Sequence, residues 1–363
     1  MKRRIGFVIE QALGHVAYGM GLKQALAHRD DIELEWIEVP FEPGTFGKIP
    51  LAGRNWTLRG SQRAYRKIAA AQRRQPLDAL FLHTQCVSLF AGPHMAKIPT
   101  LLSLDATPIN YDELAHAYRD SVQSAPVERV KQAIYSRVMG GAAAFTTWSQ
   151  WAKDSLVDHY GVSASKVTVL HPGTVLSSFP DPQQRQPKSG KPLNVLFVGG
   201  DFPRKGGDLL LETVKTHFRG KVELHLVTGA DVPPSEGVFV HRGVKPLSPQ
   251  LFQRFAEADV FVLPTRGDCL AMVLGESMAA CVPIITTRVG AHAEAVEDGR
   301  SGFLIDKDDA AALRDRIGRL EQDRSLCFDM GMRAREIGEA RFNMQTNADR
   351  IADILLSISS RPS

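Results

Sequence analysis

The chain has 363 residues, of which 44% are hydrophobic and 23% charged, and its formal net charge is +4. These values are typical of a globular protein and exclude a disordered or fibrous chain. The length is more than one hydrophobic core needs and suits two domains of about 180 residues. The four cysteines show no C-x-x-C pairing and no histidine at metal-ligand spacing. We therefore expect a reduced, cytoplasmic protein without a structural metal.

The first residues superficially resemble a signal peptide, because Lys2, Arg3 and Arg4 precede the apolar run Ile5–Ile9. Glu10 ends that run, which is too short for the apolar core of a signal peptide. No stretch approaches the ~20 apolar residues that a membrane-spanning helix requires. Both observations favour a protein of the cytoplasm.

Apolar strands alternate with helical patterns along both halves of the chain, which predicts two doubly wound, Rossmann-like α/β domains. The expected strands are Ile5–Ile9, Ile32–Val39, Ala79–Leu82, Thr100–Leu104, Ala143–Thr147 and Val167–Leu170, then a series from Asn194 that includes Val222–Thr228, Phe239–Val240, Val260–Leu263 and Val282–Thr286. Prolines, glycine and serine gather at 179–192, which is linker composition. We expect an N-terminal domain at 1–178, a C-terminal domain at 193–345 and a final helix at 346–363.

Gly14 and His15 follow the first expected strand and precede a helix expected from Tyr18 to His28. The glycines of this region are not spaced as G-x-G-x-x-G, so a dinucleotide site fits poorly. His15 is a candidate ligand-binding residue, and the alternative is a simple loop cap.

Basic residues gather in a stretch that has no acid between Pro43 and Leu77. They are Arg54, Arg59, Arg63, Arg66, Lys67, Arg73 and Arg74. A partly buried helix from about Leu58 to Arg73 would carry most of them. One interpretation is a solvated helix face; the other is attraction to anionic lipid headgroups on the inner face of a membrane, or to an acidic acceptor. Nucleic acid is a poorer partner, because no recognition motif accompanies the charge.

Polar side chains also follow the next two expected strands. His83 comes after the third strand and Asp105 after the fourth. The carboxyl ends of parallel strands share one edge of the sheet, where ligands bind in open α/β folds. His83 could instead be a satisfied edge residue, and Asp105, before Pro108, could be a helix N-cap. Ser149 and Lys153 open a further helix and are weaker candidates.

The first strand of the second half ends in two glycines, Gly199 and Gly200. Glycine lets a backbone approach a ligand closely. Arg204 and Lys205 follow, and a planar guanidinium beside a mobile ammonium suits a diphosphate. Basic pairs are also common on solvated surfaces, so this pair points to a ligand only together with the next motif.

Two carboxylates, Asp268 and Glu276, stand eight positions apart after the strand Val260–Leu263. The pattern puts Asp268 at the open carboxyl end of a buried strand and Glu276 on the first turns of the following helix. Backbone N–H groups between the two acids would be free to bind an anion. The residues that carry them are Cys269, Leu270, Ala271, Met272 and Val273.

These motifs resemble those of the retaining GT-B glycosyltransferases of family 4. That family has glycines and an R-K-G segment after a strand, an E-x7-E acidic pair and a glycine-rich tail. The tail matches here at Pro283-Ile284-Ile285, Thr287, Gly290, Glu294, Val296, Gly299, Gly302, Phe303 and Leu304. The resemblance is strong over about 195–305 and weaker over the N-terminal half. It implies two Rossmann-like domains that face a cleft, and a final helix that crosses back to the first domain.

By this resemblance Arg204 and Lys205 hold the diphosphate of a nucleotide-sugar donor, Glu276 contacts its ribose, and Asp268 faces its sugar hydroxyls. No metal ion is implied, because two cations face the diphosphate, and the acids Asp308 and Asp309 stand before a surface helix. We expect no cofactor.

The loop of Gly14 and His15 borders the acceptor pocket in the resembling family. That family often has a histidine six residues after the proline that opens the fourth strand. Counting from Pro99 leads to Asp105 in this chain. A carboxylate there could stabilise a developing oxocarbenium ion or orient the acceptor hydroxyl.

The chain departs from the family pattern at two places. It has Asp268-Cys269-Leu270-Ala271-Met272 instead of Glu-Gly-Phe-Gly-Leu, and Cys281 stands where glycine is preferred. We expect a retaining hexosyltransferase that takes UDP-glucose or a related UDP-sugar, by family frequency, and acts on a glycan, lipid or small-molecule hydroxyl. The alternatives are a catalytically degenerate sugar-nucleotide-binding protein, or a GT-B nucleotide-sugar epimerase or phosphorylase.

Overall fold

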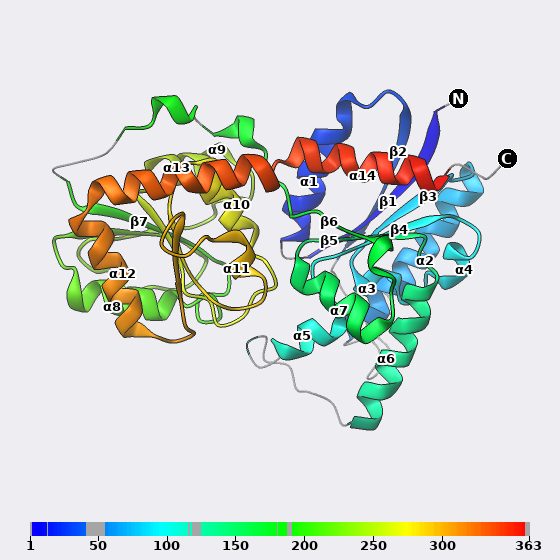
Figure 1. Ribbon diagram of the computed structural model, residues 1–363, viewed down its shortest axis with the longest axis horizontal. Helices are drawn as coiled ribbons and strands as arrows, with labels where there is room; N and C mark the ends of the chain where they lie inside the picture. Colours follow the sequence, from blue (N-terminus) through cyan, green and yellow to red (C-terminus); the bar gives the residue numbers. More distant parts are fainter. Residues whose placement is uncertain are drawn as a thin grey trace. The chain divides into compact units, whose positions relative to one another are not determined.

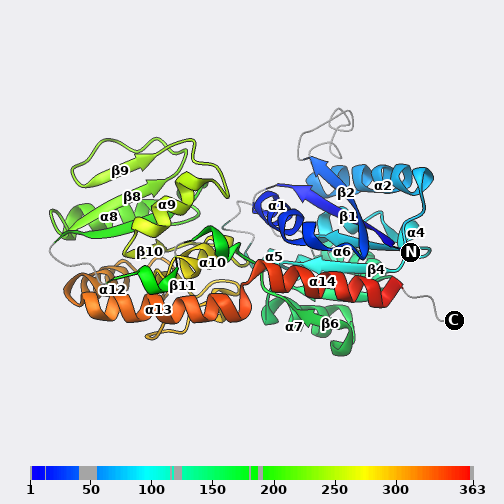
Figure 2. The same ribbon diagram turned by 90° about the horizontal axis from the view of Figure 1, so that it is seen from above.

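The computed structural model of the chain describes residues 2–12, 14–40, 55–114, 117, 125–179, 181–186 and 191–359. The chain divides into two compact units, which Figure 1 and Figure 2 show from two sides. Unit 1 comprises Met1–Glu113, Ser121–His171 and Met344–Ser363, and unit 2 comprises Leu114–Asp120 and Pro172–Asn343.

Unit 1 is built on six parallel strands in the order β2-β1-β3-β4-β5-β6. Its strands are β1 (Arg3–Gln11), β2 (Ile32–Pro40), β3 (Ala79–His83), β4 (Thr100–Leu104), β5 (Ala144–Thr147) and β6 (Val167–Val169). Its helices are α1 (His15–Ala25), η1 (Leu26–His28), α2 (Trp56–Arg74), α3 (Gln85–Ser88), α4 (Gly92–Met95), α5 (Pro108–Glu113), α6 (Ala125–Gly140), α7 (Gln150–Tyr160), η4 (Ala164–Lys166) and α14 (Met344–Ser359).

Unit 2 is also built on six parallel strands, in the order β12-β11-β10-β7-β8-β9. Its strands are β7 (Leu193–Val198), β8 (Val222–Val227), β9 (Val238–His241), β10 (Val260–Leu263), β11 (Ile284–Thr287) and β12 (Gly302–Ile305). Its helices are η5 (Leu176–Ser178), η6 (Pro182–Gln184), α8 (Gly207–His217), α9 (Pro249–Glu257), α10 (Met272–Ala279), α11 (His292–Ala295), α12 (Ala310–Gln322) and α13 (Arg324–Arg341). The two sheets confirm the predicted pair of doubly wound, Rossmann-like α/β folds.

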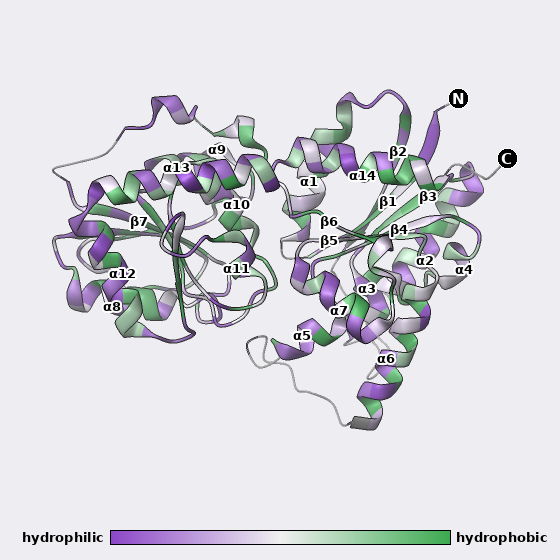
Figure 3. Ribbon diagram, viewed as in Figure 1, coloured by the Kyte–Doolittle hydropathy of each residue, from purple (hydrophilic) through white to green (hydrophobic). Residues whose placement is uncertain are grey.

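Helices cover both faces of each sheet, and the strand sequences reflect this. Every residue of β3, β4, β10, β11 and β12 is buried, as near-continuous apolar runs in parallel sheets require. The edge strands β2 and β9 are partly exposed. Figure 3 shows the same contrast, with hydrophobic central strands and hydrophilic outer faces on the helices.

The limits of the units differ by a few residues from the predicted domain limits. Unit 1 ends at His171 rather than at residue 178, because the next segment pairs within unit 2: the Thr174 N–H donates to the Phe342 carbonyl oxygen at 2.7 Å. The final helix α14 begins at Met344 and groups with unit 1, against α1 and β3.

The segment expected to be a linker at 179–192 packs on unit 2 where the structure describes it. Phe179 is buried, with its ring against Phe252, and the Arg185 guanidinium donates to the carbonyl oxygens of Ala258 and Ala280 at 2.6 and 2.9 Å. The prolines therefore lie close to the boundary between the two units, but the described part of this segment is packed on unit 2 and is not a free linker. Pro180 and residues 187–190 lie outside the described residues.

The strand order of each sheet reverses once. In unit 1, β3 joins β1 on the side opposite β2, and in unit 2, β10 joins β7 on the side opposite β8. The connections at such a point run to opposite faces of the sheet and leave a crevice at the carboxyl ends of the strands. His15 and His83 lie at this point of unit 1, and Lys205 and Asp268 at that of unit 2.

Candidate active site

An ion pair joins the two connections that meet at the reversal point of unit 2. Lys205 Nζ, on the β7–α8 turn, donates to the carboxylate of Asp268, on the β10–α10 turn. Gly206 makes this contact possible, because its φ is +75° and a Cβ there would overlap the Pro264 carbonyl oxygen. The basic turn therefore rests directly on the end of β10.

Asp268 is held in its ionised form by this surrounding charge. Burial would raise the pKa of Asp268, but the nearby cations, Lys205 above all and also Arg204, outweigh it, so the pKa lies below its ordinary value. The Arg204 guanidinium is fixed over the same turn, where it donates to the Gly267 carbonyl oxygen at 2.7 Å. An ionised carboxylate in this position accepts hydrogen bonds from hydroxyl groups.

Glu276, on α10, is in a different electrostatic state. Its side chain is buried, and its Oε2 has no hydrogen-bond partner among the described residues. Burial raises the pKa of Glu276 to about 7. A buried polar atom without a partner is uncommon in a native fold and points to a ligand that supplies one.

His292, which the sequence analysis did not select, holds the loop between the two acids. The Thr286 hydroxyl donates to the Leu263 carbonyl oxygen at 2.8 Å and therefore accepts from His292 Nδ1–H at 2.9 Å. This tautomer leaves Nε2 to accept the Ala271 N–H at 3.4 Å. Burial lowers the pKa of His292 to about 4, so the ring is neutral at pH 7. A histidine two residues after Gly290, within the glycine-rich tail that follows the two acids, is the signal that could have found it.

The other predicted residues of unit 2 offer mainly backbone. No side chain caps α10, so no capping side chain occupies the N–H groups of Met272 and Val273. The Ala271 N–H, which we expected to be free, donates to His292 Nε2. The side chains of Cys269, Leu270 and Ala271 are buried, and those of Met272 and Val273 are half-buried. Gly199 is buried and Gly200 is exposed, with no atom within 4 Å of the place a Cβ would take.

Cys281 explains one departure from the family pattern. Its φ is +55°, in the left-handed region that favours glycine. The cysteine is tolerated there as a buried residue at the end of α10. The replacement of glycine by Cys281 therefore adds conformational strain to the turn after α10 and does not change the surroundings of Asp268 and Glu276.

A second polar cluster lies at the reversal point of unit 1. α1 begins at His15, three residues earlier than expected, with Gly14 as its N-terminal cap residue. His15 Nε2 lies 3.2 Å from Glu10 Oε1 and 3.8 Å from Asp105 Oδ2. His15 Nδ1 is hydrogen-bonded to His83 Nε2 at 3.0 Å. The side chain of His15 therefore contacts two carboxylates and His83, and it is not a loop cap.

His83 is the last residue of β3 and is fully buried. Its second nitrogen, Nδ1, is hydrogen-bonded to Ser103 Oγ at 3.0 Å. Burial, followed by the nearby His15, holds the pKa of His83 well below its usual range. Both ring nitrogens have protein partners, as the alternative of a satisfied edge residue requires, so His83 offers no free nitrogen to a substrate.

Glu10 is a member of this cluster that the sequence analysis used only as the end of an apolar run. Its Oε2 accepts from Trp56 Nε1 at 3.0 Å, and burial raises its pKa although His15 partly offsets this. A carboxylate at the end of a buried strand at the reversal point is the signal that marks it.

The helix-capping alternative for Asp105 is not what the structure shows. Thr107 caps α5, because its Oγ1 accepts the Asn110 N–H at 3.2 Å. Ser149 caps α7 instead of facing a ligand, and Lys153 donates to the Val167 carbonyl oxygen at 3.0 Å. Asp105 therefore stays with the His15 cluster, whereas Ser149 and Lys153 have structural partners.

Two features are absent from the part of the chain that the structure describes. No group of three or more His, Cys, Asp or Glu side chains there could hold a metal ion. None of the helices described is both long and apolar enough to cross a membrane.

Comparison with known families decides what these clusters belong to. Residues 23–178 match the model of "Glycosyltransferase Family 4", and residues 192–323 match that of "Glycosyl transferases group 1". The chain is a family 4 glycosyltransferase by descent. The two matches include the basic pair, both acids, His83 and Asp105, whereas β1, Glu10 and His15 precede them.

Relatives of this family 4 chain are distant. A D-inositol 3-phosphate glycosyltransferase from Streptomyces avermitilis is 30% identical over 227 residues, which is 55% of this chain and 49% of that protein. The chain thus matches about half the length of such curated relatives. A sucrose-phosphate synthase from Thermosynechococcus elongatus superposes with a TM-score of 0.77 at 17% identity, covering 98% of this chain and 99% of that one. Anabaena HepE, solved with UDP-glucose, superposes at 0.70 with 16% identity, covering 98% and 99%. These structures share the GT-B fold.

Glu276→Gln should make the ligand-free protein more stable at high pH. The pKa of this carboxyl is about 7 in the folded chain against an ordinary value of 4.5, so between those values only the unfolded chain loses the proton. Stability is then lost as pH rises, by about 3 kcal/mol at pH 8 relative to pH 4. Glutamine removes this loss.

Denaturant unfolding at a series of pH values measures it. The exposed Glu212→Gln on α8 is the matched control and should leave the pH profile of the wild type unchanged. Identical profiles for Glu276→Gln and the wild type would contradict the raised pKa.

Proposed function

We propose that the protein is a retaining glycosyltransferase that moves a hexosyl group from UDP-glucose or a related UDP-sugar to a hydroxyl acceptor without a metal ion. The observation that carries this proposal is the buried Glu276, whose Oε2 has no partner among the described residues, on the same β10–α10 segment as Asp268 of the ion pair. The complex of HepE with UDP-glucose supports the choice of donor, because HepE has the same fold.

The donor side follows from charge. When a nucleoside diphosphate leaves, negative charge grows on its oxygens, and Arg204, Lys205 and the uncapped N-terminus of α10 supply the opposite charge. Asp268, kept ionised by Lys205, accepts hydrogen bonds from sugar hydroxyls. Glu276 accepts from the ribose hydroxyls and loses its proton as they bind.

The acceptor side is assigned to the cluster of unit 1. Both Asp105 and Glu10 lie close to His15, but Asp105 is partly exposed whereas Glu10 is buried. The Asp105 carboxylate is therefore the acid of this cluster that a substrate can reach. We assign to Asp105 the orientation of the acceptor hydroxyl or the stabilisation of positive charge on the sugar. The family resemblance adds that an oxygen of the leaving phosphate takes the acceptor proton on the same face, which retains configuration.

The diphosphate assignment is tested by removing the ion pair as a whole. Lys205→Ala alone would leave Asp268 as an unpaired buried charge and lower stability by about 3–5 kcal/mol. The double variant Lys205→Met with Asp268→Asn avoids this. It should bind UDP about 10- to 100-fold more weakly, the loss of one charged hydrogen bond to phosphate.

Calorimetric titration with UDP in the presence of EDTA measures this loss. The control is Arg254→Met with Glu257→Gln, which removes the ion pair of 3.0 Å on α9 and should leave UDP binding unchanged. Wild-type affinity in the first variant would overturn the diphosphate site. Wild-type binding that appears only with Mg²⁺ or Mn²⁺ would overturn metal independence.

Asp105→Asn should separate chemistry from donor binding. The asparagine keeps the size of the side chain and removes its charge, so UDP affinity and melting temperature should stay those of the wild type while kcat falls about 100-fold or more. Asp112→Asn on α5, which loses a surface ion pair with Lys131, is the control. An unimpaired kcat would remove Asp105 from the catalytic residues.

The alternatives are separated by product analysis. A degenerate protein, suggested by Asp268-Cys269-Leu270-Ala271, would bind nucleotide sugars but show neither transfer nor slow donor hydrolysis. An epimerase or phosphorylase would change the donor without a hydroxyl acceptor. Incubation with a panel of nucleotide sugars, with and without acceptors, distinguishes the three outcomes.

A further inference from the structure

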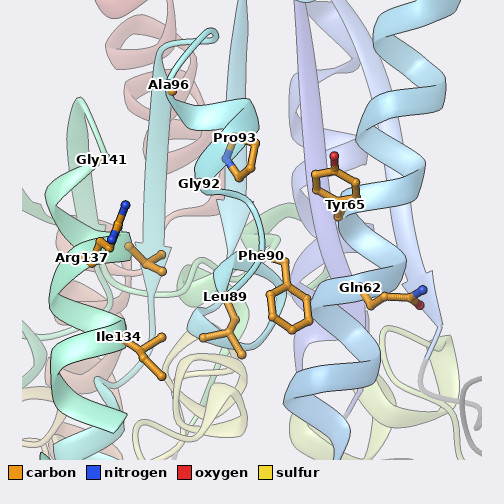
Figure 4. A pocket seen from close by; sticks show the side chains of 11 residues that line it. Gln62, Tyr65, Leu89, Phe90, Gly92, Pro93, Ala96, Ile134, Arg137 and Gly141 are labelled. Atoms are coloured by element: carbon orange, nitrogen blue, oxygen red, sulfur yellow. The ribbon is translucent and has the colours of Figure 1, made fainter. Parts of the chain in front are cut away.

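A groove with a volume of about 860 Å³ opens on unit 1 between α2, the α3–α4 segment and α6 (Figure 4). Its walls are largely apolar. The lining residues are Gln62, Tyr65, Leu89, Phe90, Gly92, Pro93, Ala96, Ile134, Arg137, Val138 and Gly141. The function proposed above uses none of them.

Large apolar side chains are exposed in and beside this α2–α6 groove. Phe90 is 40% exposed, and Ile134 on α6 is 47% exposed. Val130 and Val127, four and seven positions before Ile134, are exposed too and extend one stripe along α6. A contiguous exposed apolar surface of this kind marks a binding face.

The rim of the groove is cationic. Arg137 lines it, and the exposed Arg66 follows Tyr65 on α2. The exposed Lys97 follows Ala96, and no lining residue is acidic. This combination of apolar walls and a basic rim is complementary to a lipid surface, in which hydrocarbon chains lie below anionic headgroups.

Three other cations of the predicted basic stretch have partners within unit 1. Arg63 donates to the Pro40 carbonyl oxygen, Lys67 to that of Glu38 at 2.9 Å, and Arg74 pairs with Glu35. Arg54 lies outside the described residues.

We propose that the α2–α6 groove and its basic rim dock the protein on the interfacial region of an anionic phospholipid bilayer. Acyl chains contact Phe90, Ile134 and the α6 stripe, while Arg66 and Arg137 contact the headgroups. Tyr65, with an apolar ring and a polar hydroxyl, suits the boundary between the two. The proposal adds a partner to the proposed function, yet it is independent of the donor site, which belongs to unit 2.

Co-sedimentation with vesicles tests the proposal, using phosphatidylcholine alone or mixed with phosphatidylglycerol. The wild type should bind the mixed vesicles and not the neutral ones, and added salt should weaken binding. Phe90→Ser with Ile134→Ser, and separately Arg66→Gln with Arg137→Gln, should each reduce bound protein at least about 5-fold.

Matched controls lie on unit 2. Phe239→Ser removes a side chain that is 44% exposed on β9, and Lys215→Gln with Arg219→Gln removes two exposed cations. Both should bind mixed vesicles as the wild type does. Melting temperature and UDP titration of every variant show that the fold and the donor site are intact, so a failure of the proposed function would be visible separately.

Three results would overturn the docking surface. The first is a wild type that binds neither kind of vesicle, and the second is a set of groove variants that bind vesicles as well as the wild type does. The third is a wild-type dimer in sedimentation equilibrium that the groove substitutions dissociate, without any vesicle binding, which would assign the groove to a second copy of the chain.

Discussion

The reversal of strand order in each sheet is the constraint on which both polar clusters depend. At that point two connections leave neighbouring strands toward opposite faces, so their first residues face each other across a gap at the sheet edge. In unit 2 the gap is closed by the Lys205–Asp268 ion pair, and in unit 1 by the His15–His83 hydrogen bond. Neither pair is local in sequence, and each is created by the parallel topology.

The ion pair also sets the different states of the two acids on the β10–α10 segment. Asp268 is ionised because the cations Lys205 and Arg204 lie beside it, whereas Glu276 has only burial acting on it and a pKa of about 7. The ionised Asp268 can accept hydrogen bonds from hydroxyl groups at once. Glu276 can accept them with both oxygens only after it loses its proton, which requires a ligand to supply the hydrogen bonds that water does not supply in the buried site. This difference suits two parts of one ligand, a sugar and a ribose.

Much of the fold and of the donor side could be predicted from the sequence, because their signals are local. Apolar runs between turn residues gave the strands, and the spacing of Asp268 and Glu276 placed one on a loop and the other on a helix. Gly206 and the basic pair belong to the same short turn. Within such segments the structure is determined by interactions between residues that are close in sequence.

What could not be predicted depends on contacts between distant segments. Glu10 joins His15 only because α1 starts early, and Trp56 reaches Glu10 from another helix. Arg63 and Lys67 looked like free cations until β2 was placed beside α2. His292 became a neutral link between Thr286 and Ala271 through the neighbouring strands β10 and β11.

Proton release on donor binding tests the central claim most directly, namely that Glu276 receives the ribose of a nucleotide-sugar donor beside the ion pair. UDP-glucose is the suitable ligand because its esterified phosphates do not titrate near neutral pH. Titrations near pH 7 in buffers of different ionisation enthalpy give the number of protons exchanged. The account predicts that the wild type releases a fraction of a proton and that Glu276→Gln releases none. Binding without proton release, or the same release in both proteins, would contradict it.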